Sequence, residues 1–179
     1  MTNDFEVVAS SPLLSSFVFD VERRVVAHQG SEFVRDVVTH RGAVAILCID
    51  TDLRVAIIRQ YRVTVDAYTY ELPAGTIEIG ETDTLAVAKR ELAEEIGVVA
   101  TVWRHIGTFF NSPGWTTQRM FLYAASAIQH VGRQPHGPEE LSSTIEWWHH
   151  DQVLSYMADD SPKDGTTSVG LLWYLQNYA

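Results

Sequence analysis

Two almost wholly apolar runs, 43-AVAILCI-49 and the first half of 54-RVAIIRQYR-62, most constrain what this chain can fold into. The short turn DTDL joins them. A strand that is apolar on both faces belongs in a sheet that is covered on both sides. A length of 179 residues is enough for one domain with a substantial core. We therefore expect a layered domain built around these two strands.

The remaining segments show shorter periodic patterns. Residues 16–28 and 32–40 alternate apolar and polar positions, as half-buried strands do. We expect a short strand in YTYELPAG, further strands at 101–110, 117–126 and 144–150, helices at 83–96, 151–157 and 166–178, and a loop at 129–143. This order predicts an α+β fold with an antiparallel-rich mixed sheet, or a layered αβα sandwich.

Composition excludes several classes of function. The net charge of −10 argues against a nucleic-acid backbone or an anionic membrane as the main partner. An anionic substrate would need a bridging cation or locally placed arginines. Cys48 is the single cysteine, so a disulfide within the chain is impossible. With neither a signal-peptide pattern nor an apolar run of about 20 residues, we expect a cytoplasmic protein.

The segment 75-GTIEIGETDTLAVAKRELAEEIG-97 concentrates negative charge. With Glu71 it has seven carboxylates, opposed only by Lys89 and Arg90. Asp83 or Thr84 can cap the expected helix, and Gly97 suits its C-terminal end.

Helical spacing puts Glu91 and Glu95 one turn apart on one face, where like charges repel. The helix dipole also disfavours negative charge at this C-terminal end. A divalent cation with a preference for oxygen ligands would reverse both penalties. The alternative, on charge alone, is a solvated acidic face, but the Gly-rich turn before the helix and Arg90 beside the acids favour a site.

The same segment resembles the Nudix box, G-x5-E-x7-R-E-U-x-E-E-x-G-U, where U is a bulky aliphatic residue. One departure is visible, because eight residues instead of seven separate Glu81 from Arg90. The extra residue falls at the junction of loop and helix, where an insertion costs little. The matching positions are Gly75, Glu81, Arg90, Glu91, Leu92, Glu94, Glu95, Gly97 and Val98.

This resemblance implies a Nudix αβα sandwich and metal-dependent hydrolysis of a nucleoside diphosphate derivative, with Mg²⁺ or Mn²⁺ as the cofactor. Glu91 and Glu95 would be the main metal ligands, and Glu94 would bind or support a further metal. The Ala74 carbonyl would complete the shell. Arg90 would hold an acid in place by a bidentate pair, and Glu81 would anchor the loop and is a further candidate metal ligand.

Motifs outside the box, QYR, ELPAG and SPG, resemble the ADP-ribose pyrophosphatase branch of the family. The resemblance implies that Arg35 and Arg62 contact the diphosphate. It also places the general base on a loop after the last long strand, where Glu140 is the first choice and Glu139 the second. The substrate-binding candidates near the SPG turn are Pro113, Gly114 and Trp115.

One residue weakens the choice of substrate. Many ADP-ribose enzymes have a glutamate where this chain has Gln118. A nucleotide sugar or another nucleoside diphosphate derivative is therefore an alternative substrate, and a Nudix-fold binding module without turnover is a second alternative. The resemblance further implies that residues 1–40 form a strand region used in a homodimer, and that residues 41–179 form the hydrolase domain.

Overall fold

The computed structural model of the protein describes residues 4–178. These residues form two compact units. One contains the described residues up to Gly42 together with Phe109–Arg119, and the other contains Ala43–Thr108 and the described residues from Met120 onward.

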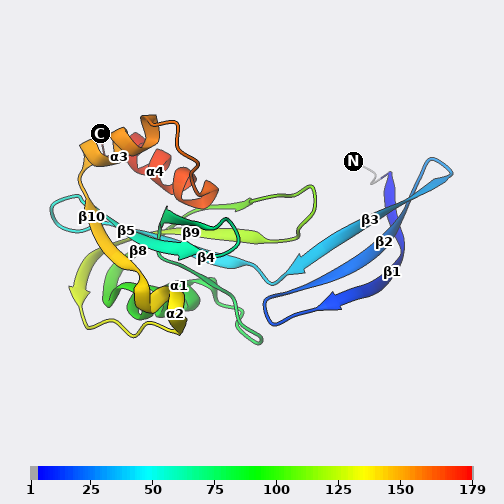
Figure 1. Cartoon of the computed structure of the whole chain (residues 1–179), viewed down its shortest axis with the longest axis horizontal. Coiled ribbons are helices and arrows are strands. Elements are labelled where there is room, and N and C mark those ends of the chain that lie inside the picture. The colour runs from blue at the N-terminus through cyan, green and yellow to red at the C-terminus, as the bar shows by residue number, and fades with distance from the viewer. Residues whose placement is uncertain (1–3, 179) are drawn as a thin grey trace. The chain divides into compact units, whose positions relative to one another are not determined.

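The N-terminal unit is built on a three-stranded antiparallel sheet of β1 (Phe5–Ser15), β2 (Phe19–His28) and β3 (Ser31–His40), in that order (Figure 1). The segment Phe109–Arg119 attaches to β3, because the Val38 amide donates to the Trp115 carbonyl at 2.8 Å. Every residue of β1 is exposed. The sheet therefore leaves many apolar side chains in solvent.

The larger unit contains two sheets, so the α+β class expected from the sequence is confirmed. The four-stranded sheet has the order β7–β4–β9–β8, with β9 parallel and β7 antiparallel to β4. The three-stranded sheet has the order β10–β5–β6 and is antiparallel. The strands are β4 (Ala43–Cys48), β5 (Val55–Arg62), β6 (Ala67–Glu71), β7 (Ala74–Thr76), β8 (Val98–Phe110), β9 (Arg119–His130) and β10 (Thr144–Trp148).

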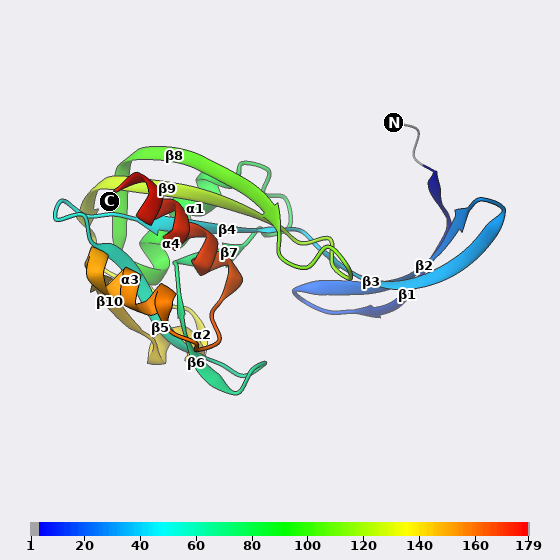
Figure 2. The ribbon, with the colours of Figure 1, turned by 90° about the horizontal axis from the view of Figure 1, so that it is seen from above.

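Helices cover the four-stranded sheet on both sides, as the apolar runs predicted. Figures 1 and 2 show α1 (Thr84–Ile96) on one side of β4 and α4 (Gly165–Asn177) on the other. All six residues of β4 are buried. Alternate residues Val44, Ile46 and Cys48 belong to the core cluster that includes the apolar side of α1. The other helices are α2 (Gly137–Ser142) and α3 (His150–Ala158).

The helix α1 lies within one residue of its expected bounds. Asp83 is its N-cap, since its carboxylate accepts hydrogen bonds from the amides of Leu85 and Ala86. Gly97 ends the helix in the left-handed conformation with φ of 66°, which a glycine adopts without steric cost.

The expectation of a loop over residues 129–143 was wrong in two places. Strand β9 continues to His130, and α2 forms a short helix within the segment. None of the residues of α2 is buried, so no apolar stripe marked it in the sequence. The YTYELPAG segment also divides into two strands, β6 and β7, which pair with different neighbours. Among the described residues, no helix has the length and apolar character needed to cross a membrane.

Candidate active site

Strand β7 lies directly against the acidic end of α1. The Ala74 amide donates a hydrogen bond to Glu95 Oε2 at 2.8 Å. A Cβ built at Gly75 would lie only 1.9 Å from the carboxyl carbon of Glu91. The absence of a side chain at Gly75 therefore makes room for the Glu91 carboxyl group, and the structure brings Ala74, Glu91 and Glu95 together.

Both of these glutamates are buried, Glu91 beside the Arg90 guanidinium and Glu95 against the Ala74 amide. Burial raises the pKa of Glu91 to about 7, opposed by Arg90 and reinforced by Glu94 and Glu140. Burial also raises the pKa of Glu95 to about 8, opposed by the Ala74 amide and reinforced by Glu91 and Glu140. Two buried carboxylates in proximity cost free energy when both are ionised. This is the environment that a cation would relieve.

Arg90 pairs with three acids at once. Its guanidinium lies 2.9 Å from Glu91 Oε1 and 2.9 Å from Glu94 Oε2. It also reaches both oxygens of Glu81 at 3.3 Å. These neighbours raise the pKa of Arg90 although burial acts in the opposite direction. Arg90 therefore holds the loop acid and the helix acids in one arrangement.

Glu81 keeps its contact with Arg90 despite the extra residue between them. Its Oε2 accepts a hydrogen bond from the Glu78 amide at 2.7 Å. The Asp83 cap starts the helix at Thr84, so the added residue is accommodated in the loop segment before α1. The longer spacing thus leaves the pairing of Glu81 with Arg90 intact.

Arg62, at the end of β5, is fixed by Glu71 at the end of β6. Arg62 Nε and Nη2 donate to the two Glu71 oxygens at 2.9 and 2.6 Å. Glu71 also accepts from Gln60 Nε2 at 3.0 Å and Thr69 Oγ1 at 2.5 Å. Burial alone would raise the pKa of Glu71, but these donors hold it below its usual value. Arg62 is thereby oriented by a buried, fully paired carboxylate.

The role of Glu71 was missed in the sequence, although a signal was present. The segments 60-QYR-62 and 69-TYE-71 both alternate polar and aromatic residues, and they occupy paired antiparallel strands. Because side chains alternate across a strand, the polar residues of both segments share one face. That pattern predicts a polar network beside Arg62.

The two candidate bases lie on α2, and they face different partners. Glu139 Oε2 lies 3.7 Å from Arg62 Nη1. Glu140 is close enough to Glu91 and Glu95 to raise the pKa of both, and its carboxylate accepts from the His136 amide at 2.6 Å. This arrangement favours Glu140 over Glu139 as the acid that works beside a metal.

The other substrate-binding candidates belong to the N-terminal unit. Arg35, on β3, donates to the Val34 carbonyl at 2.8 Å and lies 4.6 Å from the centre of the Phe33 ring. Trp115 is 57% exposed in the turn that contains Pro113 and Gly114. Its amide donates to the Ser112 carbonyl at 3.1 Å. A large aromatic ring in such a turn is available to stack on a ligand.

The donor chemistry around α1 suits a hard divalent cation. Glu91, Glu95 and Glu94 offer carboxylate oxygens and Ala74 offers a backbone carbonyl, and Mg²⁺ and Mn²⁺ prefer such oxygen ligands. In the part of the chain that the structure describes, however, no three His, Cys, Asp or Glu side chains already form a metal site. Arg90 and the Ala74 amide occupy oxygens that a metal would use. Binding a metal therefore requires small side-chain shifts.

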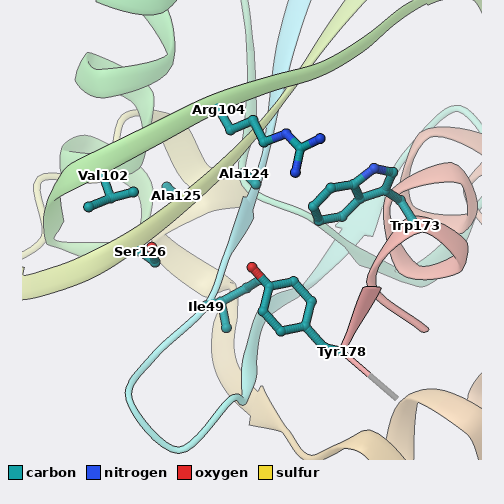
Figure 3. Close-up of a pocket in the computed structure, with 8 residues that line it drawn as sticks. All are labelled: Ile49, Val102, Arg104, Ala124, Ala125, Ser126, Trp173 and Tyr178. Carbon is teal, nitrogen blue, oxygen red and sulfur yellow. The ribbon is translucent and has the colours of Figure 1, made fainter. Parts of the chain in front are cut away.

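A separate hollow lies in the larger unit, between α4 and the strands β8 and β9. Arg104 and Trp173 are among the residues that line it (Figure 3), and the guanidinium carbon of Arg104 lies 5.5 Å from the centre of the Trp173 ring. The hollow contains no carboxylate and none of the predicted site residues, so it is not the reaction site. Its lining consists of Ile49, Val102, Arg104, Ala124, Ala125, Ser126, Trp173 and Tyr178.

Comparison with known proteins decides the family. The model of the NUDIX domain matches residues 39–167. The chain belongs to the Nudix family. The matched residues include the segment 75–97, so the family predicted from the Nudix box is confirmed.

Similar proteins include enzymes and one regulator. The chain is 33% identical to an ADP-ribose pyrophosphatase of Mycobacterium tuberculosis over 82% of its own length and 71% of that protein. It is 29% identical to a methanol dehydrogenase activator of Bacillus methanolicus over 96% of this chain and 89% of the relative. A solved ADP compounds hydrolase superposes with a TM-score of 0.83 at 21% identity, over 98% of this chain and 94% of that one. The last comparison confirms the Nudix fold.

Proposed function

We propose that this Nudix protein hydrolyses the diphosphate bridge of ADP-ribose, with Mg²⁺ or Mn²⁺, to give AMP and ribose 5-phosphate. The observation that carries the proposal is that Glu91, Glu95 and Glu140 lie close together and next to Arg62. Arg62 also pairs with Glu139, which is on the same helix, α2, as Glu140. A related ADP-ribose pyrophosphatase at 33% identity supports the choice of substrate.

The proposal assigns each of these residues the role that the family resemblance implies. Glu91 and Glu95 would hold the cation, together with the Ala74 carbonyl, and Glu94 would support a further one. The bound cation would neutralise charge on the diphosphate and make the attacking water easier to deprotonate. Glu140 accepts the proton of that water as general base.

The arginines divide between binding and support. Arg62, oriented by Glu71, binds the diphosphate through the guanidinium edge that faces the loosely held Glu139. Arg90 keeps the acids of α1 and Glu81 in register. By resemblance to the family, we also assign Arg35 to the diphosphate and the Pro113-Gly114-Trp115 turn to the nucleoside end, and both belong to the N-terminal unit.

We further propose that the protein is a cytoplasmic homodimer, with the N-terminal strands of residues 1–40 in the interface and residues 41–179 as the hydrolase domain. Exposed apolar side chains of the N-terminal unit support this, since Val7 and Leu14 on β1 are 52% and 51% exposed and Phe17, in the turn before β2, is 93% exposed. Large apolar side chains left in solvent in such number are typical of an interaction site. The free, buried Cys48 is compatible with a reducing compartment.

A second candidate substrate is another nucleoside diphosphate derivative, such as a nucleotide sugar. The observation in its favour is Gln118, a neutral amide that accepts from Asn111 Nδ2 at 3.3 Å. An amide carries no negative charge, so Gln118 does not supply the anionic ligand or acceptor that a carboxylate would.

A substrate panel tests the proposal. The purified protein is incubated with Mg²⁺ and either ADP-ribose or a series of nucleotide sugars, and the products are separated and quantified. We expect the highest kcat/KM for ADP-ribose, products AMP and ribose 5-phosphate, and no turnover with EDTA. A higher kcat/KM for a nucleotide sugar would replace the substrate, and absence of any turnover would favour a binding module.

A further inference from the structure

Arg133, in the segment between β9 and α2, joins two parts of the site that are far apart in the sequence. Its Nε donates to the Glu95 carbonyl at 2.5 Å, in the last turn of α1. Its Nη2 donates to the Glu140 carbonyl at 2.7 Å, and Nη1 donates to the Ser143 carbonyl at 3.3 Å. One guanidinium thus links the backbone of a predicted metal ligand to the backbone of the predicted base.

The backbone around Arg133 is attached to the same end of α1. The Gln134 amide donates to the Glu94 carbonyl at 3.0 Å, and the Val131 amide donates to the Gly97 carbonyl at 2.8 Å. A Cβ built at Gly97 would lie 2.6 Å from the backbone nitrogen of Arg133. Gly97 therefore permits this close approach in addition to ending the helix.

The other end of the link is equally well defined. The Glu140 carbonyl also accepts from the amide and hydroxyl of Ser143, at 3.1 and 2.9 Å. Ser143 is buried, and its hydroxyl oxygen accepts from Arg133. The backbone on which Glu140 stands is therefore fixed, whereas its side chain makes an exposed contact with the His136 amide that it can exchange.

Arg133 also supplies charge that α1 lacks. The last turn of α1 contains Glu94 and Glu95 and no basic residue. A cation near the carbonyl end of a helix stabilises it, through the dipole and through hydrogen bonds to the free carbonyls. The guanidinium of Arg133 takes this place from outside the helix.

We infer that Arg133 is a positioning residue that fixes Glu140 relative to the metal-binding end of α1. The inference rests on the proposed function, in which Glu140 is the general base. The planar fork of arginine is needed, because it serves three carbonyls in different directions, whereas a lysine ammonium on a flexible stem does not reproduce that geometry. These four hydrogen bonds of Arg133 go to backbone carbonyls and to the Ser143 hydroxyl, so none of them uses a carboxylate of the site.

The test compares Arg133→Ala and Arg133→Lys with the wild-type protein in steady-state ADP-ribose hydrolysis. Loss of a partner that supports a functional group typically costs about 10- to 100-fold in activity. We expect kcat to fall by about this factor in both variants, with KM within about 3-fold, because substrate-binding groups are unchanged. Low millimolar methylguanidinium should restore part of the kcat of Arg133→Ala, and methylammonium should not.

Arg54→Ala is the matched control. Arg54 also makes several hydrogen bonds and has a side chain that is 35% exposed, but it precedes β5 at the end opposite Arg62. We expect its kcat to equal that of the wild type. If Arg133→Ala fails to fold, Arg133→Lys carries the test, and a wild-type kcat in that variant would overturn the inference.

A double-mutant cycle separates this inference from the proposed function. Glu140→Gln alone should lower kcat strongly, and adding Arg133→Ala should cost less than about 3-fold more, since residues acting through one another are not additive. Losses that multiply would show that Arg133 does not act through Glu140. A wild-type kcat for Glu140→Gln would instead refute the base assignment, and the inference with it.

Discussion

Gly75 is defined by the group that occupies the space beside it. A methyl group at this position would collide with the Glu91 carboxyl group at 1.9 Å. Arg90 draws the same carboxyl group from the other direction at 2.9 Å. The position of one predicted metal ligand therefore depends on a residue 16 positions earlier in the chain, which no helical pattern reveals.

Gly75→Ala tests this dependence. We expect the variant to lose most of its hydrolytic activity and about 1–3 kcal/mol of stability, because a well-packed site must shift to admit a methyl group. Activity assays and thermal unfolding give both values. Gly107→Ala is the control, since a Cβ there meets nothing within 4 Å. Full activity in Gly75→Ala would show that the Glu91 carboxylate need not lie against β7.

Glu71→Gln tests how Arg62 is oriented. The amide cannot accept both guanidinium bonds, so Arg62 should lose its fixed orientation and KM should rise by about 10-fold, equivalent to one lost hydrogen bond to a charged group. The comparison is Asp36→Asn, which breaks the exposed Arg23–Asp36 pair at 2.7 Å and should change little. An unchanged KM in Glu71→Gln would remove Arg62 from the binding of the diphosphate.

At the scale of the elements, apolar patterns predicted most of the fold. The fully buried β4 and the capped α1 were visible in the sequence, because an apolar run and a terminal Asp–Gly pair are local signals. The short α2 was not, since none of its residues is buried. The i, i+4 spacing predicted the pairing of Glu91 with Glu95, whereas the contacts of Arg133 depend on tertiary packing and had no local signal.

The acidic end of α1 makes the metal-free protein sensitive to pH. The folded-state pKa values of Glu91 and Glu95 are raised to about 7 and 8, above the ordinary value of 4.5. Between the unfolded-state pKa of 4.5 and these raised folded-state values, the folded protein binds more protons than the unfolded chain. The free energy of unfolding therefore falls as the pH rises from about 5 to 8. We expect the Tm in EDTA to decrease over this range relative to that of Glu95→Gln.

Saturating Mg²⁺ should reduce that slope, because a cation favours the ionised carboxylates and stabilises the state that binds it. Differential scanning calorimetry at a series of pH values, with EDTA and with Mg²⁺, measures both effects. If the Tm of the wild type in EDTA changed with pH in the same way as the Tm of Glu95→Gln, the raised pKa values of Glu91 and Glu95 would be contradicted.

At the scale of the whole molecule, the exposed apolar surface of the N-terminal sheet predicts self-association. We expect the wild type to elute as a dimer in size-exclusion chromatography with light scattering. Leu14→Glu, on the edge strand β1, should shift the protein toward the monomer, since a buried unpaired charge is costly. Leu172→Glu, at a 56% exposed position of α4, is the control. A monomeric wild type at micromolar concentration would refute the proposed dimer.

The central claim is that the acids of α1 bind a cation that hydrolysis requires. Initial rates of ADP-ribose hydrolysis over a range of Mg²⁺ concentrations, for the wild type and Glu95→Gln, test it most directly. We predict that Mg²⁺ activates the wild type saturably and that Glu95→Gln lowers the rate by at least about 100-fold, because losing a metal ligand should cost more than losing its supporting partner. The circular dichroism spectrum of the variant should be unchanged. Wild-type turnover without a cation, or full turnover in a folded Glu95→Gln, would contradict the claim.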